Sequence, residues 1–281
     1  MLMLIPDTEI DRWLLEDVPF GDLTTHALGI GERLGCMKFQ ARETLVAAAS
    51  EEAVRLLVRV GCTVGEVCPS GAKVEAGAQL LVADGSAAAL LAGWKVAQTL
   101  MEYASGIATV AADIVQAARA VNPKIVVACT RKTFPGAKAI SLKAIMAAGA
   151  APHRIGLSET VLVFPEHRVF LAGSSLASAL ARLKMACPER KIVVEVNHSE
   201  EALVAAQAGA DVVQLEKFPP DIVATLVARM AEVAPHAKVA AAGGVNLANA
   251  ADYARAGAHI LVTSAPYFAP PADIKVIISA R

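Results

Sequence analysis

The sequence is poor in the residues that mark several common classes of protein. Only 4% of its 281 residues are aromatic, and its five cysteines show no CxxC spacing, which disfavours a zinc site. We interpret the cysteines as reduced thiols of a cytoplasmic protein. The formal net charge is −1, so we expect no general nucleic-acid-binding surface.

Long apolar runs are also missing. The longest, Ala87 to Trp94, is followed by Lys95 and is too short to span a bilayer, and the N-terminus does not resemble a signal peptide. No Ser-His-Asp order, HExxH motif or Walker A motif is present. What is present is a chain that is 55% hydrophobic, with ample material for a core.

The pattern of the chain changes near residue 122. Before it we expect a helix at 7–16, strands at 37–40 and 45–49, and helices at 51–60, 87–103 and 107–121, the last two separated by Ser105-Gly106. After it, strand-like and helix-like runs alternate, which is typical of a parallel sheet. We predict strands at 125–129, 155–163, 191–196, 212–215, 239–242 and 260–262, and helices at 176–187, 200–208, 222–233 and 247–256.

These strands suggest a complete or partial barrel, and barrels carry their sites at the C-terminal ends of the strands. Polar residues concentrate at those ends. They are Arg131 and Lys132, Ser158 and Glu159, Glu195, Glu216, Gly243 and Gly244, and Thr263 and Ser264. The sequence therefore predicts one polar site along this edge.

Four basic residues form the most informative group. Arg131 and Lys132 follow the run 125–129, and His153 and Arg154 are expected to start the next strand. A cluster of fixed cations is typical of a carboxylate or phosphate site. A structural cluster or a solvated rim is the alternative.

Two glutamates lie at or inside predicted strand ends, where most positions are apolar. Carboxylates are rarely buried without a partner. Glu195 and Glu216 can bind Mg²⁺, accept hydrogen bonds from sugar hydroxyls or stabilise a developing positive charge. A structural ion pair with Lys132 or Lys217 is the alternative.

A pair of glycines follows the predicted strand 239–242. Gly243 and Gly244 are expected to lead into a helix that begins near Asn246, where free N–H groups can hold a phosphate. Ser264, after the last strand, is expected to close the same pocket. A simple turn is the alternative.

The order of these motifs resembles the quinolinate phosphoribosyltransferase family over nearly the whole chain. The matching segments are 16–17 with 21–25, 105–109, 130–133 with 135–136, 153–154 with 156–157, 195–196 and 243–244. The resemblance implies an α/β fold with an N-terminal α/β sandwich, residues 1–106, and an incomplete α/β barrel of six to seven strands, residues 107–265. The tail, 266–281, is expected to pack back on the first domain.

The resemblance also implies an activity and a set of site residues. The family transfers the phosphoribosyl group of PRPP to quinolinate with Mg²⁺, and loss of CO₂ then gives nicotinate mononucleotide. It implies a homodimer or dimer-based oligomer in which one subunit's N-terminal domain caps the barrel of the other. By position, the catalytic residues would be Lys132, Glu195 and Glu216, with both glutamates near Mg²⁺; the substrate-binding residues would be Arg131, Lys138, His153, Arg154 and Tyr103; and the phosphate-binding residues would be Gly243, Gly244 and Ser264.

Several positions depart from the family pattern, mainly on the acceptor side. Tyr103 stands where the family usually has Arg, and Phe164 where it has Lys. The further departures are Lys138 for Arg, Glu216 for Asp and Pro152 for Asn. Because losing one buried charged partner typically costs about 2–5 kcal/mol, quinolinate would bind poorly. The pattern is similar to the ModD branch, pyrophosphorylases associated with molybdenum transport.

We therefore expect a phosphoribosyltransferase that uses PRPP, Mg²⁺ and a small anionic acceptor other than, or in addition to, quinolinate, with no membrane partner. One alternative is a genuine quinolinate enzyme of NAD biosynthesis. Another is a non-catalytic anion-binding protein linked to molybdenum transport. A third is an aldolase that uses Lys132 to form a Schiff base.

Overall fold

The computed structural model describes residues 4–171 and 173–281, and the chain divides into two compact units. The first takes in the chain up to Ala112, together with Thr133–Gly149 and Pro266–Arg281, and the second consists of Asp113–Lys132 and Ala150–Ala265. The domain limits predicted from sequence, at 106 and 265, remain predictions. Along the described part of the chain, no helix combines the length and hydropathy needed to cross a membrane.

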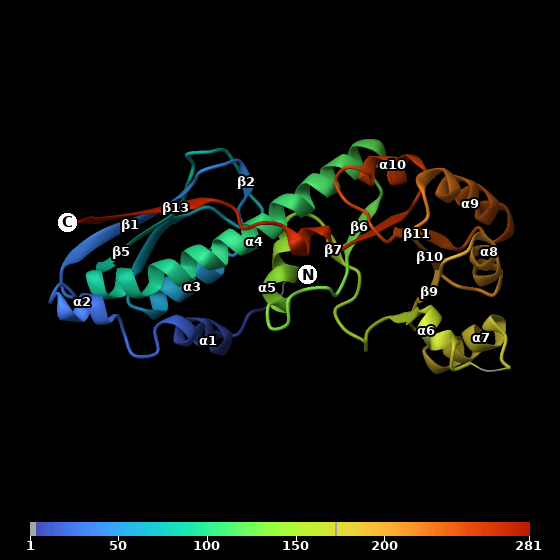
Figure 1. Ribbon diagram of the computed structural model, residues 1–281, viewed down its shortest axis with the longest axis horizontal. Helices are drawn as coiled ribbons and strands as arrows, with labels where there is room; N and C mark the ends of the chain where they lie inside the picture. Colours follow the sequence, from blue (N-terminus) through green and yellow to red (C-terminus); the bar gives the residue numbers. More distant parts are fainter. Residues whose placement is uncertain (1–3, 172) are drawn as a thin grey trace. The chain divides into compact units, whose positions relative to one another are not determined.

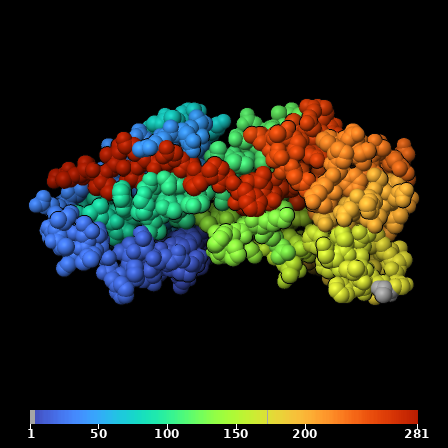
Figure 2. Space-filling model, in the orientation of Figure 1, coloured from blue at the N-terminus to red at the C-terminus, as the bar shows by residue number. Residues whose placement is uncertain are grey.

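The first unit is built on an antiparallel sheet in the order β13-β1-β5-β3 (Figure 1). Strand β13 comes from the end of the chain yet pairs with β1, and Figure 2 shows these C-terminal residues, in red, running along the surface of this unit. A separate pair joins β2 to β4. The strands are β1 (Leu34–Ala41), β2 (Leu45–Val46), β3 (Thr63–Val67), β4 (Lys73–Val74), β5 (Gln79–Ser86) and β13 (Ile274–Ala280).

Helices cover this sheet because both elements present apolar faces. In β1 the side chains of Met37 and Phe39 are fully buried, whereas Lys38 between them is exposed. Lys143 of α5 forms an ion pair with the buried Glu52 of α3, at 2.6 Å. The helices that lie wholly in this unit are α1 (Asp7–Asp17), α2 (Leu23–Ala27), α3 (Ser50–Arg59) and α5 (Lys138–Ala147). The unit also contains the part of α4 (Ala87–Val121) up to Ala112 and the part of the 3₁₀ helix η1 (Ala265–Phe268) from Pro266 onward.

The predicted break at Ser105-Gly106 is wrong, because α4 is one continuous helix. Ser105 is buried, and its Oγ accepts a hydrogen bond from the Ala48 N–H at 3.1 Å. A Cβ on Gly106 would lie 2.1 Å from the carbonyl oxygen of Pro270. The two residues therefore allow other backbone segments to approach the helix closely, and they do not end it.

The second unit contains a parallel sheet of seven strands, in the order β7-β6-β12-β11-β10-β9-β8. Strands β7 and β8 form the two edges and do not pair with each other, so the barrel is incomplete, as predicted. The strands are β6 (Val126–Cys129), β7 (Ala151–Pro152), β8 (Val161–Val163), β9 (Ile192–Val196), β10 (Val212–Glu216), β11 (Lys238–Ala242) and β12 (Ile260–Thr263).

The single strand predicted at 155–163 is wrong. Only its last three residues are a strand, β8, and residues 153–160 form a loop that follows the short strand β7. The Glu159 carboxylate accepts a hydrogen bond from the Gly156 N–H at 2.6 Å, which holds the loop in a non-extended form. The helices of this unit are α6 (Pro165–Arg168), α7 (Leu176–Ala186), α8 (Ser199–Gln207), α9 (Pro220–Val233) and α10 (Ala250–Arg255).

Candidate active site

The candidate residues of the second unit lie along one edge of its sheet. All seven strands are parallel, so their C-terminal ends meet at the same edge. Arg131 and Lys132 follow β6, His153 and Arg154 follow β7, Glu195 lies in β9, Glu216 ends β10, Gly243 and Gly244 follow β11, and Ser264 follows β12. The structure thus brings nine predicted site residues to one edge.

Three placements differ from the sequence-based expectation. His153 and Arg154 follow a strand and do not begin one, because β7 precedes them. Glu159 precedes β8 and caps its own loop, so it does not mark a strand's C-terminal end. Lys138, exposed at the start of α5, belongs to the first unit, although the expected limits put it in the barrel. Tyr103 on α4 is also exposed and belongs to the first unit, as expected.

Arg154 is the most unusual cation of the site. It is only 7% exposed, and its guanidinium lies over the ring of Phe164, 5.4 Å from the centroid. It forms no ion pair with any residue that the structure describes. Burial lowers the pKa of Arg154, the nearby cation Arg131 lowers it further, and the charge of Glu159 opposes this shift. A buried, unpaired guanidinium is costly, so its position favours an anionic ligand.

His153 does not add a positive charge at neutral pH. Burial lowers the pKa of its imidazole to about 4, and the Arg154 guanidinium contributes to the same shift. The backbone N–H of His153 donates to the Cys129 carbonyl at 2.8 Å, which ties the end of β7 to the end of β6. Arg131, Lys132 and Arg154 are therefore the cations of the basic group, and His153 is a neutral hydrogen-bonding residue.

The two glutamates share one face of the sheet with a third polar residue, Gln214. Gln214 pairs in register with Glu195 on β9 and lies two residues before Glu216. Its side chain is 4% exposed, and its Nε2 donates to Glu195 Oε2 at 2.5 Å. The Gln214 Oε1 is buried and has no hydrogen-bond partner among the described residues.

The surroundings of the Glu195 carboxyl disfavour its charged form. Burial raises its pKa, and the nearby Glu216 adds to the increase. The hydrogen bond from Gln214 and the charge of Lys132 oppose it. Because these effects oppose each other, a bound cation or a hydroxyl donor would stabilise the charged form of this half-buried carboxyl.

The glycine turn after β11 provides space beside Glu216. A Cβ on Gly243 would lie 2.7 Å from Glu216 Oε1, and its φ is +82°. The N–H groups of Gly243 and Gly244 donate no hydrogen bond to the described residues. Two adjacent free N–H groups next to glycine Cα atoms are suited to an oxyanion.

The helix expected after the glycine pair is present, but its predicted start near Asn246 is wrong. Helix α10 begins only at Ala250, because Asn246 and Asn249 use their side chains to close a turn on the Gly244 carbonyl, each at 3.0 Å. A phosphate here would meet the glycine turn and not a helix N-terminus. Thr263 Oγ1 donates to the Val245 carbonyl at 2.6 Å, which joins this turn to the end of β12 beside Ser264.

Glu195 and Glu216 do not form a complete metal site by themselves, but they could bind a metal ion together with the phosphates of a substrate. Within the described ranges, no group of three or more His, Cys, Asp or Glu side chains could hold an ion. Glu216 lies close enough to Glu195 to raise the pKa of the Glu195 carboxyl. Mg²⁺ is commonly held by one or two carboxylates together with substrate phosphates, and these two residues fit that pattern.

Sequence reasoning missed Gln214. One signal was present, since a glutamine interrupts the apolar run Val212-Val213-Gln214-Leu215 two positions before Glu216. In a strand that spacing puts both side chains on one face. Its contact with Glu195 depended on the register between two strands, which the sequence does not state.

Comparisons with known proteins agree with the geometry. Residues 22–105 match the N-terminal domain, and residues 107–277 the C-terminal domain, of quinolinate phosphoribosyl transferase. The fold is similar to that of NadC from Streptococcus pyogenes, with a TM-score of 0.90, 22% identity and 100% of each chain covered. It is also similar to a nicotinate-nucleotide pyrophosphorylase from Francisella tularensis, with a TM-score of 0.89, 21% identity, and 99% of this chain and 98% of that chain covered.

The sequence relatives include two groups. The chain is 53% identical to a Rhodobacter capsulatus protein named as the pyrophosphorylase ModD, over 91% of this chain and 98% of that protein. It is 32% identical to the human carboxylating nicotinate-nucleotide pyrophosphorylase, over 91% of this chain and 84% of that protein. The chain therefore belongs to the quinolinate phosphoribosyl transferase family and is more similar to the ModD protein than to the human enzyme.

Proposed function

We propose that this protein is a ModD-like phosphoribosyltransferase that transfers the phosphoribosyl group of PRPP to a small anionic acceptor. One observation carries the proposal. Glu195 and Glu216 lie on adjacent strands, and a glycine turn with two free N–H groups follows the next strand and adjoins Glu216. This arrangement suits a ligand that has a phosphate at one end and a centre of developing positive charge at the other.

The proposed reaction exchanges one bond at the ribose C1 for another. The C1–oxygen bond to pyrophosphate breaks, and the pyrophosphate oxygen takes the electron pair. A nucleophilic atom of the acceptor forms the new bond to C1. The carboxylates of Glu195 and Glu216 would stabilise the positive charge that develops on the ribose, and Gly243, Gly244 and Ser264 would hold its 5′-phosphate.

Mg²⁺ is part of the proposal. When bound, it would neutralise charge on the departing pyrophosphate. Glu195 and Glu216 are the residues that would hold it. Lys132, which lies close enough to lower the pKa of Glu195, would keep that carboxylate ionised and contact the leaving group.

The acceptor side is proposed to differ from that of a quinolinate enzyme. Arg131 and Arg154 would bind an anionic group, whereas His153 is neutral at pH 7. Tyr103 and Phe164 stand at positions where the resemblance implies cations. A genuine quinolinate phosphoribosyltransferase is the second candidate, supported by the 32% identity to the human enzyme.

The assembly is also a proposal. The family resemblance supports a homodimer in which the N-terminal domain of one subunit caps the barrel of the other. Tyr103 and Lys138 would then reach the acceptor from the capping domain. The sequence resemblance to the ModD branch supports a role linked to molybdenum transport.

The direct test is pyrophosphate release from PRPP and Mg²⁺ with a panel of small acids that includes quinolinate and nicotinate. Glu195→Gln is the control for catalysis, and Glu200→Gln, an exposed residue of α8, is its matched surface control. Acceptor-dependent release that only Glu195→Gln abolishes would support the proposal. PRPP binding without release for any acid would favour the non-catalytic anion binder, and fast turnover of quinolinate would favour the second candidate.

A further inference from the structure

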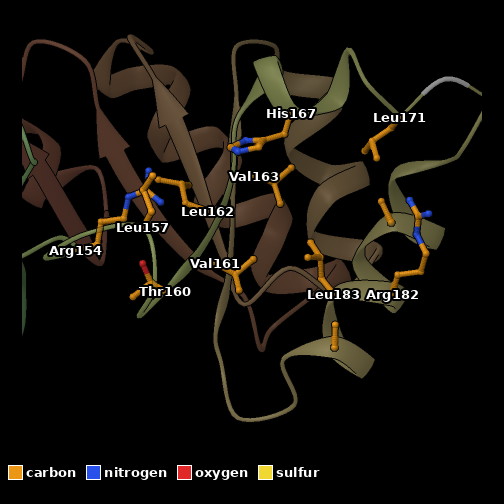
Figure 3. Close-up of a pocket in the computed structure, with 12 residues that line it drawn as sticks. Arg154, Leu157, Thr160, Val161, Leu162, Val163, His167, Leu171, Arg182 and Leu183 are labelled. Carbon is orange, nitrogen blue, oxygen red and sulfur yellow. The ribbon is translucent and has the colours of Figure 1, made fainter.

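The pocket between the edge strand β8 and helix α7 is not suited to a phosphate group. It has a volume of about 520 Å³ and a mainly apolar lining. Figure 3 shows Arg154 and Leu162 on one side of β8, and Arg182 on the other. The strand therefore separates the two arginines of the lining, and apolar walls disfavour a doubly charged group. The donors that a phosphate needs gather instead at the C-terminal edge of the sheet, around Gly243.

Lys217, directly after β10, has an unusual backbone conformation. Its φ is +62°, in the left-handed region that residues other than glycine rarely adopt. The Lys217 N–H donates to the Ala242 carbonyl at 2.8 Å, which ties this turn to the end of β11. The chain thus has a lysine where glycine or asparagine would be less strained. Backbone strain of this kind is common at binding sites.

The left-handed turn brings the Lys217 side chain to the glycine turn. In a regular strand, the side chains of Glu216 and Lys217 would point to opposite faces of the sheet. Here both border Gly243, because a Cβ on that residue would lie 2.7 Å from Glu216 Oε1 and 2.6 Å from Lys217 Cγ. The glycine at this position therefore leaves room for the lysine stem as well as for the carboxylate.

The ammonium of Lys217 has no partner within the described ranges. Lys217 is exposed, and its side chain forms no ion pair or hydrogen bond with a described residue, Glu216 included. The N–H groups of Gly243 and Gly244 beside it donate to no described acceptor either. A flexible cation and two free N–H groups at one turn are suitable donors for a phosphate group.

From this juxtaposition we propose that Lys217 binds the 5′-phosphate of the phosphoribosyl donor, together with the N–H groups of Gly243 and Gly244. This inference rests on the proposed phosphoribosyl transfer and adds a residue to its phosphate site. The ammonium partly neutralises the phosphate, which the neighbouring Glu216 carboxylate would otherwise repel.

The test measures, by calorimetry at constant ionic strength, the binding of ribose 5-phosphate and, with Mg²⁺, of pyrophosphate. It compares the wild type with Lys217→Met, Lys217→Arg and Lys238→Met. Lys238 is exposed at the start of β11, on the opposite edge of the sheet, so its variant loses the same charge away from the site. Lys217→Met should weaken ribose 5-phosphate about tenfold, whereas Lys217→Arg and Lys238→Met should bind it as the wild type does.

Equal binding of ribose 5-phosphate by Lys217→Met and the wild type, or no binding by the wild type, would overturn the inference. So would a loss confined to pyrophosphate, which would assign Lys217 to the leaving group. An equal loss in Lys238→Met would also overturn it, because the effect would then be one of net charge. Failure of the proposed function would look different, since Mg²⁺-dependent binding of PRPP would be absent while ribose 5-phosphate still bound through Lys217.

The backbone conformation allows an independent measurement. Asparagine adopts the left-handed region more readily than lysine, so Lys217→Asn should have a higher urea midpoint than the wild type. Its binding of ribose 5-phosphate should nevertheless be weaker, because its shorter side chain has no charge. Lys217→Met keeps the same backbone cost and should unfold at the wild-type midpoint. A midpoint of Lys217→Asn at or below that of the wild type would contradict the inference that binding keeps a lysine in this conformation.

Discussion

At the scale of single residues, the hydrogen bond from Gln214 favours the charged form of Glu195. The Gln214 amide donates this bond, which acts against burial and the charge of Glu216. A hydrogen bond to a charged group contributes about 1.5–3 kcal/mol, and one pKa unit corresponds to about 1.4 kcal/mol. The loss of this bond should therefore raise the pKa of Glu195.

We predict that Gln214→Leu raises the pH below which Mg²⁺-dependent PRPP binding is lost, because the Glu195 carboxylate loses the hydrogen bond that lowers its pKa. Calorimetric titrations between pH 5 and 8 would measure the midpoint. Gln207→Leu, at an exposed position of α8, is the control and should not move it. An unchanged midpoint in Gln214→Leu would show that Gln214 is only a packing residue.

His153 gives a second prediction, about stability. Its folded-state pKa is lowered from 6.5 to about 4, so between these values the unfolded chain binds a proton that the folded chain does not. Stability should therefore fall as the pH drops through this window. His153→Gln should reduce the fall in the urea midpoint between pH 7.5 and 5, whereas His198→Gln, at an exposed position, should not. Equal falls in all three proteins would contradict the assignment.

The chemistry of single residues could be predicted in part from sequence. Arg131, Glu195 and Gly243 were identified because charged residues or glycines follow apolar runs. The neutral state of His153 and the contact of Gln214 with Glu195 could not be predicted. Both depend on burial and on neighbours from other strands, which arise only in the folded sheet.

At the scale of elements, mainly apolar runs of three to six residues were enough to predict β6, β9, β10, β11 and β12. The short edge strands β7 and β8 were not predicted as separate strands, because the single strand predicted there includes polar residues that lie between them. The continuity of α4 was missed because a Ser-Gly pair usually indicates a helix end. Here the tertiary contacts of Ser105 and Gly106 require small residues inside a helix.

Gly106 allows a direct test of this explanation. Alanine favours helices over glycine by about 1 kcal/mol, so propensity alone predicts that Gly106→Ala stabilises the protein. The 2.1 Å approach of its Cβ to the Pro270 carbonyl instead predicts destabilisation of about 1–3 kcal/mol, measured by urea unfolding. Gly65→Ala is the control, because its nearest atom would be 3.9 Å away. Stabilisation by Gly106→Ala would refute the close-approach explanation.

At the scale of the whole molecule, the barrel class followed from alternating strands and helices. The strand order of the antiparallel sheet in the first unit could not be predicted in this way, because its pairing of β13 with β1 joins segments from opposite ends of the chain. Nearest-neighbour patterns carry no information on such pairing. The family resemblance, and not the residue pattern, supplied the N-terminal sandwich and the expected dimer.

The proposed dimer predicts complementation between inactive variants. Light scattering should give twice the 29.1 kDa chain mass or a multiple of that. If the capping domain comes from the partner, then mixing Tyr103→Ala with Glu195→Gln after subunit exchange should restore about a quarter of the wild-type acceptor-dependent activity. A mixture that is no more active than its two components would contradict capping by the partner.

The central claim is that the incomplete barrel binds PRPP at the C-terminal edge of its sheet, through Glu195 and Glu216 and the turn at Gly243 and Gly244. The most direct measurement is calorimetric titration of PRPP, with and without Mg²⁺, into the wild-type protein and Glu216→Gln. We predict one PRPP per chain in the wild type, dependence on Mg²⁺, and at least tenfold weaker binding in Glu216→Gln, which is about 1.4 kcal/mol. Absence of binding to the wild type, or equal binding by both proteins, would contradict the account.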